Sequence, residues 1–316
     1  MIRKSIFTAI ALLLGYQLLL PHLPRKFYQT SGQQRDNYLR AQRYVYDAPD
    51  NINVVLGSSR SLDLNEETLG PGFTKLTFPG SSIFTALEII RRAGKHPHIM
   101  LIETNNVEWD ADPDLLNDVF NPWLFRIRRY LSSFREQGRP SNFVVGITEA
   151  CVRKTCKKVI FRGRDKPQMP VAQLKSEQAS LLKQLIAIEA TNVQRVPSAA
   201  LLRDHANRLG EYVDQLLKQG SICVFYEMPC DSALIDSPQF SAQRRAVEAR
   251  FPRGKYDWLA FTRDHNYETV DGIHLTEPEI DRLTQTVVDQ LNAIIHDEGR
   301  RNLSAATLAK TTRPGP

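Results

Sequence analysis

The sequence predicts an α/β protein in which helices cover both faces of a parallel sheet. Short apolar runs that end at glycine, proline or polar residues recur along the chain, and amphipathic stretches with helical spacing separate them. Strands that alternate with helices usually pair in parallel and are buried on both faces. The chain has 316 residues, of which 42% are hydrophobic and 24% charged, so it is long enough to bury such a core.

The first predicted element is an apolar helix near the N-terminus. Residues 6–20 carry no charge, and Pro21 ends the run. A helix of that length covers about 22 Å, against roughly 30 Å of bilayer hydrocarbon. No small-x-small cleavage pattern follows, so we expect residues 1–24 to be an uncleaved signal anchor, with a cleaved signal or a buried helix as the alternatives. The expected location is a single pass through the inner membrane, with the domain in the periplasm or another extracytoplasmic space.

The elements beyond the anchor follow from apolar periodicity and turn residues. Residues 25–50 lack a sustained apolar period and are expected to form a linker, and the domain covers residues 51–297. Its strands are expected at residues 53–56 (NVVL), 75–78 (KLTF), 99–102 (IMLI), 222–226 (ICVFY) and, for a short fifth strand, within 256–261. Its helices are expected at residues 82–93, 171–196, 199–219 and 278–295, with an irregular insertion over about 107–170 and a disordered tail over 298–316.

Four cysteines bear on the compartment. Cys151, Cys156, Cys223 and Cys230 form an even set, which in an exported chain permits two disulfides. The pairs that are local in sequence, Cys151–Cys156 and Cys223–Cys230, are the simplest, and free buried thiols are the alternative. No CxxC spacing supports a zinc site, so we expect no bound metal.

Charge and motifs exclude several classes of protein. A net charge of +6 suits an anionic membrane surface or an acidic glycan and is too weak to indicate nucleic acid. Residues 153–166 hold seven Lys or Arg against one Asp, which is typical of a solvated loop or of a site for an anionic glycan or lipid head group. The aromatic residues between Trp109 and Phe134 indicate either a small core of the insertion or a platform for a sugar. Nucleotide binding has no support, because neither GxGxxG nor a Walker loop occurs.

The candidate catalytic residues follow predicted strands or lie on a late loop. Ser59 comes after the first strand, and Asp271 and His274 share a loop near the C-terminus. A serine hydroxyl becomes nucleophilic when a base lies within hydrogen-bond reach, and an aspartate can hold the imidazole in the useful tautomer. His265, beside Asp264, is a rival base, but its aspartate is adjacent rather than three residues earlier.

Three groups could stabilise a tetrahedral oxyanion. The backbone N–H groups of Ser59 and Gly80 and the side-chain amide of Asn105 follow three different predicted strands. Active sites of open parallel sheets form beyond the carboxyl ends of the strands, so we expect these donors to converge there. Removing one such donor typically costs about 2.7–4 kcal/mol of barrier.

Over residues 50–295, this set of blocks resembles the SGNH/GDSL hydrolase superfamily. The serine block matches at Ser59, the glycine block at Gly80, the asparagine block at Asn105, and the Asp-x-x-His block at Asp271 and His274. The resemblance implies a flavodoxin-like three-layer sandwich that hydrolyses or transfers acyl esters without a cofactor. The departures are Ser58 where the family usually has Asp, Glu103 where it has Gly, and Asn106 where it has Asp.

The same resemblance implies partners and leaves alternatives open. Anchored members with a Gly-Ser-Ser turn resemble proteins that acylate or deacylate cell-surface polysaccharides, often beside a membrane-bound acyltransferase. We therefore expect O-acyl ester hydrolysis or acyl transfer on an extracytoplasmic glycan through an acyl-Ser59 intermediate, with no nucleic-acid partner. A non-catalytic assembly component with the same fold and a lipase-like esterase are the alternatives.

Overall fold

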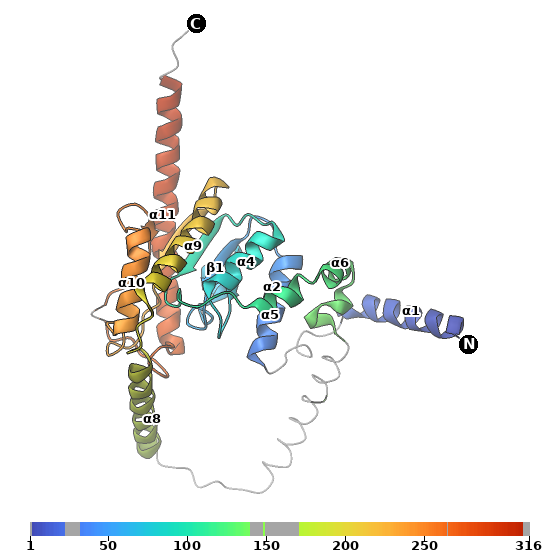
Figure 1. The fold of residues 1–316 in the computed structure, drawn as a ribbon, viewed down its shortest axis with the longest axis horizontal. Coiled ribbons are helices and arrows are strands. Elements are labelled where there is room, and N and C mark those ends of the chain that lie inside the picture. The colour runs from blue at the N-terminus through green and yellow to red at the C-terminus, as the bar shows by residue number, and fades with distance from the viewer. Residues whose placement is uncertain (1, 23–31, 140–147, 149–170, 264, 312–316) are drawn as a thin grey trace. The chain divides into compact units, whose positions relative to one another are not determined.

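A computed structural model describes residues 2–22, 32–139, 148, 171–263 and 265–311 (Figure 1). The chain divides into two compact units. One unit consists of Met1–Pro49, Glu88–Lys95 and Ala111–Ser180, and the other of Asp50–Leu87, His96–Asp110 and Leu181–Pro316. The second unit contains the sheet and every predicted site residue.

The predicted parallel sheet is present, with five strands. They are β1 (Asn53–Gly57), β2 (Phe73–Thr77), β3 (Ile99–Glu103), β4 (Ile222–Tyr226) and β5 (Asp257–Trp258). All pair in parallel in the order β2-β1-β3-β4-β5, which is the flavodoxin-like order. Chain order reverses between β1 and β3, and ligands of such sheets bind beyond the carboxyl ends of the strands at that point. β5 is shorter than the range expected for it.

Helices cover both faces of the sheet, so the predicted α/β class and its layering are confirmed. On one face, alternate strand residues such as Val55 and Leu101 join a buried cluster with Leu283 of α11 (Glu277–Thr311). On the other face, α9 (Ala199–Lys218) contacts β4 and packs against α10 (Pro238–Arg250).

Two further helices of the second unit complete its layers. Phe84 of α4 (Ile83–Ala93) lies edge-on to the ring of His205 in α9, with 5.5 Å between ring centroids. The short α3 (Glu66–Leu69) contacts both β2 and α11. Both helices pack on faces that the strands would otherwise expose to water.

The predicted linker over residues 25–50 is wrong in its second half. Residues Gln33–Asp47 form α2, whose buried side chains are Asn37, Ala41, Gln42 and Tyr44. Two of these four are polar, so the buried face shows no apolar period in the sequence. A period of 3.6 residues is visible only when hydrophobic residues mark the inner face.

The insertion is more regular than expected as far as residue 139. It contains α5 (Pro113–Val119) and α6 (Pro122–Tyr130), followed by the short 3-10 helices η3 (Ser132–Phe134) and η4 (Glu136–Gly138). The side chains of Asp112 and Asn121 cap α5 and α6, and each helix has a proline in its first turn. An Asp or Asn cap followed by proline is a typical signal for the start of a helix. These signals predict the two helices better than the irregular hydrophobic pattern of the segment does. The basic segment 153–166, Cys151 and Cys156 lie outside the described residues.

The N-terminal helix matches the predicted apolar segment. α1 (Ile2–Leu19) is 18 residues long, has a mean hydropathy of 1.3 and buries none of its residues. At 1.5 Å per residue it spans about 27 Å, close to the thickness of bilayer hydrocarbon. Within the described residues it is the one helix long and apolar enough to cross a membrane.

Two expectations about the remaining chain are corrected. α11 continues to Thr311, through most of the tail expected to be disordered, because its alanine and leucine residues are strong helix formers. Cys223 and Cys230 are both free, so the bridge expected between them is absent. Burial raises the pKa of Cys223 to about 12 and that of Cys230 to about 11, as expected of thiols that serve in packing.

Candidate active site

The turn after β1 presents Ser59 at the carboxyl edge of the sheet. β1 ends at Gly57, and Ser59 follows two residues later, partly exposed. A Cβ atom on Gly57 would overlap the carboxylate of Glu103 and the side chain of Ser61, so only glycine allows this close approach. Ser59 thereby stands beside the point where the strand order reverses between β1 and β3.

A buried carboxylate stabilises this turn through hydrogen bonds. Glu103, the last residue of β3, is 1% exposed and accepts hydrogen bonds from the backbone N–H of Ser58 at 2.9 Å and from its hydroxyl at 2.7 Å. It also accepts one from the hydroxyl of Ser61, which in turn accepts one from the Tyr226 hydroxyl at 2.7 Å. Burial and then the charge of Glu103 raise the pKa of Tyr226 well above its usual value, so this hydroxyl stays protonated.

A continuous chain of hydrogen bonds links Ser59, His274 and Asp271. Ser59 Oγ lies 2.8 Å from His274 Nε2, and His274 Nδ1 lies 2.7 Å from Asp271 Oδ2. Because a carboxylate only accepts hydrogen bonds, Nδ1 carries the proton and Nε2 is left to accept the Ser59 hydroxyl. The structure thus brings together the three residues predicted from sequence, in the geometry of a nucleophile, base and orienting acid.

Asp271 is held as a carboxylate. Burial acts to raise its pKa, but the hydrogen bonds from the His274 side chain and from the backbone N–H groups of His274 and Ile273 outweigh burial and lower it to about 2. The intervening Gly272 has φ of 100°, a conformation that glycine adopts readily and that curls the loop around the carboxylate. Asp271 therefore remains charged at neutral pH.

The rival base predicted at His265 has a different partner. Its Nε2 atom lies 3.1 Å from Glu279 Oε1, and its ring meets Tyr267 edge-on with 4.6 Å between centroids. Glu279 is 4% exposed, so it is a buried partner for this imidazole. His265 therefore belongs to the α11 side of the fold, and no contact joins it to Ser59.

A cavity of about 320 Å³ opens beside Ser59. Its lining comes from the turn after β1, the loops after β2 and β3, and the helices α8 (Val171–Asn192) and α10. The lining residues are Ser58, Ser59, Arg60, Gly80, Asn106, Glu108, Trp109, Glu189, Asn192, Val193, Gln239, Phe240 and Ile273. Most of these side chains are polar or charged, which suits a hydrophilic ligand better than an alkyl chain.

The predicted oxyanion donors differ in whether they line the cavity beside Ser59. Gly80 lines the cavity together with Ser59 and has φ of 72°. Asn105 is 5% exposed and does not line it, because its amide is bound to the backbone of Met228, with Nδ2 donating to the carbonyl at 3.0 Å and Oδ1 accepting from the N–H at 2.7 Å. The next residue, Asn106, does line the cavity. The Asn105 amide expected to supply a donor is therefore bound to the backbone of Met228, and Asn106 is the asparagine that lines the cavity.

This arrangement predicts different effects for the two asparagines. Asn106→Ala should lower kcat for ester turnover by roughly a hundredfold to a thousandfold, as loss of one oxyanion donor does elsewhere. Asn105→Ala should instead lower the free energy of unfolding by about 2 kcal/mol, because it leaves two backbone groups of Met228 without partners. Steady-state kinetics and chemical denaturation of both variants separate the two roles. A larger loss of kcat in stable Asn105→Ala than in Asn106→Ala would restore the original assignment.

The buried Glu103 predicts a second separation. Glu103→Gln should lower the free energy of unfolding by about 2 kcal/mol, because the amide NH₂ would face donors that now bind a carboxylate. It should also slow acylation, since the turn that carries Ser59 loses its support. Chemical denaturation and kcat measure the two effects. The matched control is Glu248→Gln, at an exposed ion pair with Arg253, which should change stability by under about 1 kcal/mol. Equal effects in the two variants would contradict this role.

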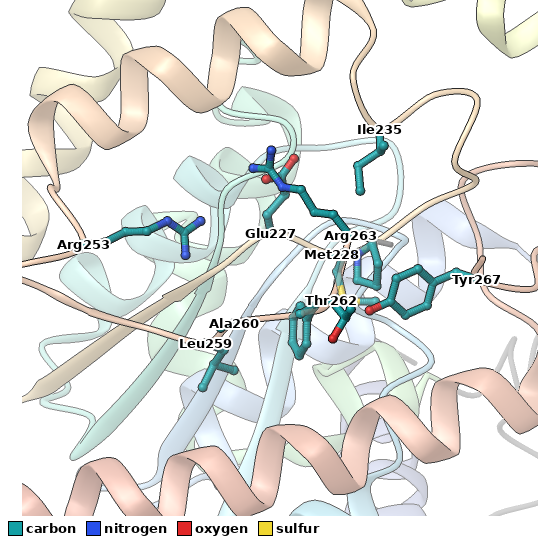
Figure 2. A pocket seen from close by; sticks show the side chains of 11 residues that line it. Glu227, Met228, Ile235, Arg253, Leu259, Ala260, Thr262, Arg263 and Tyr267 are labelled. Atoms are coloured by element: carbon teal, nitrogen blue, oxygen red, sulfur yellow. The ribbon is translucent and has the colours of Figure 1, made fainter. Parts of the chain in front are cut away.

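A second cavity lies beyond β4 and β5 and contains no member of the hydrogen-bonded chain. Figure 2 shows its side chains, among them Glu227, Arg253, Arg263 and Tyr267. It has a volume of about 230 Å³, and none of its lining residues lines the cavity beside Ser59. The chemistry described above therefore belongs to the larger cavity alone.

Comparison with known proteins adds no assignment to this geometry. No protein-family model matches the chain, and a search of curated proteins finds no significant match. Within the described residues, no three His, Cys, Asp or Glu side chains are grouped as a metal site requires. The site must therefore be interpreted from its own residues.

Proposed function

We propose that this protein is a serine-dependent enzyme that hydrolyses or transfers O-acyl esters through an acyl-Ser59 intermediate. The observation that carries the proposal is the unbroken chain from Ser59 through His274 to Asp271, with distances of 2.8 and 2.7 Å, beside a polar cavity. Such a chain would rarely arise by chance, because the two loops that form it are 215 residues apart in sequence. The sequence resemblance to SGNH/GDSL hydrolases supports the same reaction.

The proposed first half-reaction forms the acyl-enzyme. Ser59 Oγ bonds to the ester carbonyl carbon while its proton moves to His274 Nε2, and the carbonyl electron pair moves onto the oxygen. The N–H groups of Ser59 and Gly80 and the amide of Asn106 stabilise that oxyanion. When the pair returns, the bond to the alcohol oxygen breaks, and His274 gives its proton to the departing alcohol.

The second half-reaction releases the acyl group. His274 takes a proton from water or from a sugar hydroxyl, whose oxygen attacks the carbonyl carbon. The bond from that carbon to Ser59 Oγ then breaks, and His274 returns the proton to Ser59. Attack by water gives hydrolysis, and attack by a sugar gives transfer. Asp271 stays ionised throughout and stabilises the imidazolium. These steps use side chains and backbone N–H groups of the protein and require no cofactor.

The setting of the reaction is part of the proposal. α1 is suited to anchor the protein in the inner membrane, and the resemblance supports a domain in the periplasm or another extracytoplasmic space. There the substrate would be an acylated glycan, and a membrane-bound acyltransferase would be the natural partner to supply or share acyl groups. A C-terminal reporter fusion that is active only in the cytoplasm would contradict this topology.

Fluorophosphonate labelling is the direct test of the proposed function. The probe phosphonylates a serine, with loss of fluoride, only where a base has made the hydroxyl nucleophilic. We therefore expect one modified residue, Ser59, identified by peptide mapping. Heat-denatured protein is the control for non-specific reaction. If folded protein remains unlabelled, the enzyme proposal fails, and the non-catalytic assembly component takes its place.

A further inference from the structure

A buried cation beside Ser59 has one guanidinium nitrogen with no hydrogen-bond partner among the described residues. Arg60, adjacent to Ser59 in sequence, is 5% exposed and lies over the ring of Phe240 at 4.6 Å. Its Nη1 atom is buried and makes no hydrogen bond with the residues that the structure describes. Stacking on Phe240 fixes the guanidinium at the wall of the cavity, where a donor is left for a ligand.

A buried acceptor lines the same cavity. Gln239 donates a hydrogen bond to Glu108 Oε1 at 2.9 Å, which orients the carboxylate. Its other oxygen, Oε2, is buried and makes no hydrogen bond within the described part of the chain. Burial raises the pKa of Glu108. A backbone hydrogen bond, the Gln239 amide, the charge of Arg60 and the Gln243 amide partly offset that effect, so Arg60 is close enough to act on the carboxylate.

A hydroxyl has the hydrogen-bonding capacity that suits each of these atoms. A hydroxyl accepts a hydrogen bond from Nη1 and donates one to Oε2. A carboxylate or phosphate would satisfy Arg60 alone and would meet Glu108 and Glu189 with like charge. The cavity walls therefore favour a neutral, hydroxylated group over an anion.

The rest of the lining indicates more than one hydroxyl. Trp109 is 45% exposed at the cavity and offers an aromatic face, and the amides of Asn106, Asn192 and Gln239 lie around the same space. Aromatic surface together with carboxylate and amide groups suits a ring that is apolar on its faces and hydroxylated at its edge. The sequence left Trp109 open as part of a core or a sugar platform, and its place in this cavity favours the platform.

We propose that Arg60 and Glu108 together bind a hydroxyl of the alcohol part of the ester, and that this alcohol is a saccharide ring lying against Trp109. The proposal rests on the proposed function and adds the residues that select the substrate. It assigns Arg60 and Glu108 to substrate binding, whereas Ser59 and His274 would perform the reaction.

The kinetic test compares a sugar ester with an ester that has no hydroxyl. The substrates are mono-O-acetylated methyl glucopyranosides and p-nitrophenyl acetate, and the variants are Arg60→Gln and Glu108→Gln. We expect the ratio of kcat/KM for the sugar ester to kcat/KM for the aryl ester to fall at least tenfold in each variant, mainly through KM. Glu211→Gln, on the exposed side of α9, is the matched control and should leave the ratio unchanged. An unchanged ratio in both site variants would overturn the proposal.

Two further measurements distinguish a hydroxyl ligand from an anionic one and binding from turnover. If Arg60→Gln lowers kcat/KM for a hemisuccinate aryl ester more than it lowers kcat/KM for the sugar ester, Arg60 binds an anionic acyl group and the hydroxyl assignment is wrong. Saturation-transfer NMR of Ser59→Ala with the acetylated glucosides measures binding without turnover. Signal that is lost on adding Arg60→Gln or Glu108→Gln supports the subsite even if the protein proves inactive, and absence of any signal contradicts it.

Discussion

Alanine at Ser59 or at His274 should reduce ester turnover by about 10⁵- to 10⁶-fold, the largest effect expected for any substitution in this protein. Ser59→Ala removes the atom that bonds to the acyl group, and His274→Ala removes the acceptor of its proton, now 2.8 Å away. The double variant should be about as inactive as either single variant, because the two side chains act in one step. Steady-state kinetics with an aryl acetate measures all three.

His265→Ala is the matched control for this experiment. This imidazole is bound to Glu279 rather than to Ser59, so its loss should leave turnover within about threefold of the wild type. Circular dichroism and thermal unfolding confirm that each variant is folded. Substantial activity in folded Ser59→Ala would rule out the acyl-serine intermediate, and additive losses in the double variant would show that Ser59 and His274 do not act as a unit.

Asp271→Asn should lower kcat by about 10⁴-fold while preserving the fold. The asparagine Oδ1 atom can still accept the N–H groups of Ile273 and His274, but its NH₂ group would face His274 Nδ1. That contact favours the tautomer with the proton on Nε2, which cannot accept the proton of Ser59. Asp112→Asn, at the cap of α5 where asparagine caps equally well, is the control and should retain activity.

The same variant tests the charge state of Asp271. The pKa of Asp271 is lowered to about 2 in the folded protein, so its charge stabilises the fold above the unfolded pKa, near 3.9. The stability difference between wild type and Asp271→Asn should therefore be constant above about pH 5 and shrink as the pH falls towards 2. Thermal unfolding at intervals between pH 2 and 6 measures it. A difference that grows on acidification would contradict a depressed pKa.

Two departures from the SGNH/GDSL pattern lie in contact with one another. Ser58 stands where the family usually has Asp, and Glu103 stands where it has Gly. In the structure the Ser58 hydroxyl and N–H both donate to the Glu103 carboxylate, and the missing Cβ of Gly57 leaves room for it. The carboxylate that contacts this turn is therefore supplied by β3. The pair was not visible as a pair in sequence, because 45 residues separate its members.

The oxyanion assignment shows where a motif ceases to be sufficient. Asn105 matches the family block, yet its amide is held on both sides by the backbone of Met228, in the loop after β4. Buried backbone groups require partners, and the Asn105 amide supplies one for the Met228 N–H and one for the Met228 carbonyl. One position along, Asn106 reaches the cavity. A sequence pattern locates a candidate oxyanion donor to within a residue or two. It does not determine which of the neighbouring side chains will bind to the backbone of another loop.

Features that depend on local chemistry were predictable from the amino-acid sequence. Apolar runs ending at turn residues located four of the five strands closely, and the Asp-x-x-His spacing predicted the pair Asp271 and His274, which is hydrogen-bonded in the structure. Local patterns failed where polar residues face the interior, as in α2, whose buried face includes Asn37 and Gln42.

Tertiary structure alone decided which of these groups meet. The parallel order β2-β1-β3-β4-β5 brings the carboxyl ends of the strands to one edge, and this places Ser59 against His274 from 215 residues away. It also assigned Asn105 to Met228, Glu103 to Ser58, and Arg60 and Glu108 to one cavity. The physical reason is that buried donors, acceptors and charges take the partners that packing brings within about 3 Å, and sequence separation does not encode that proximity.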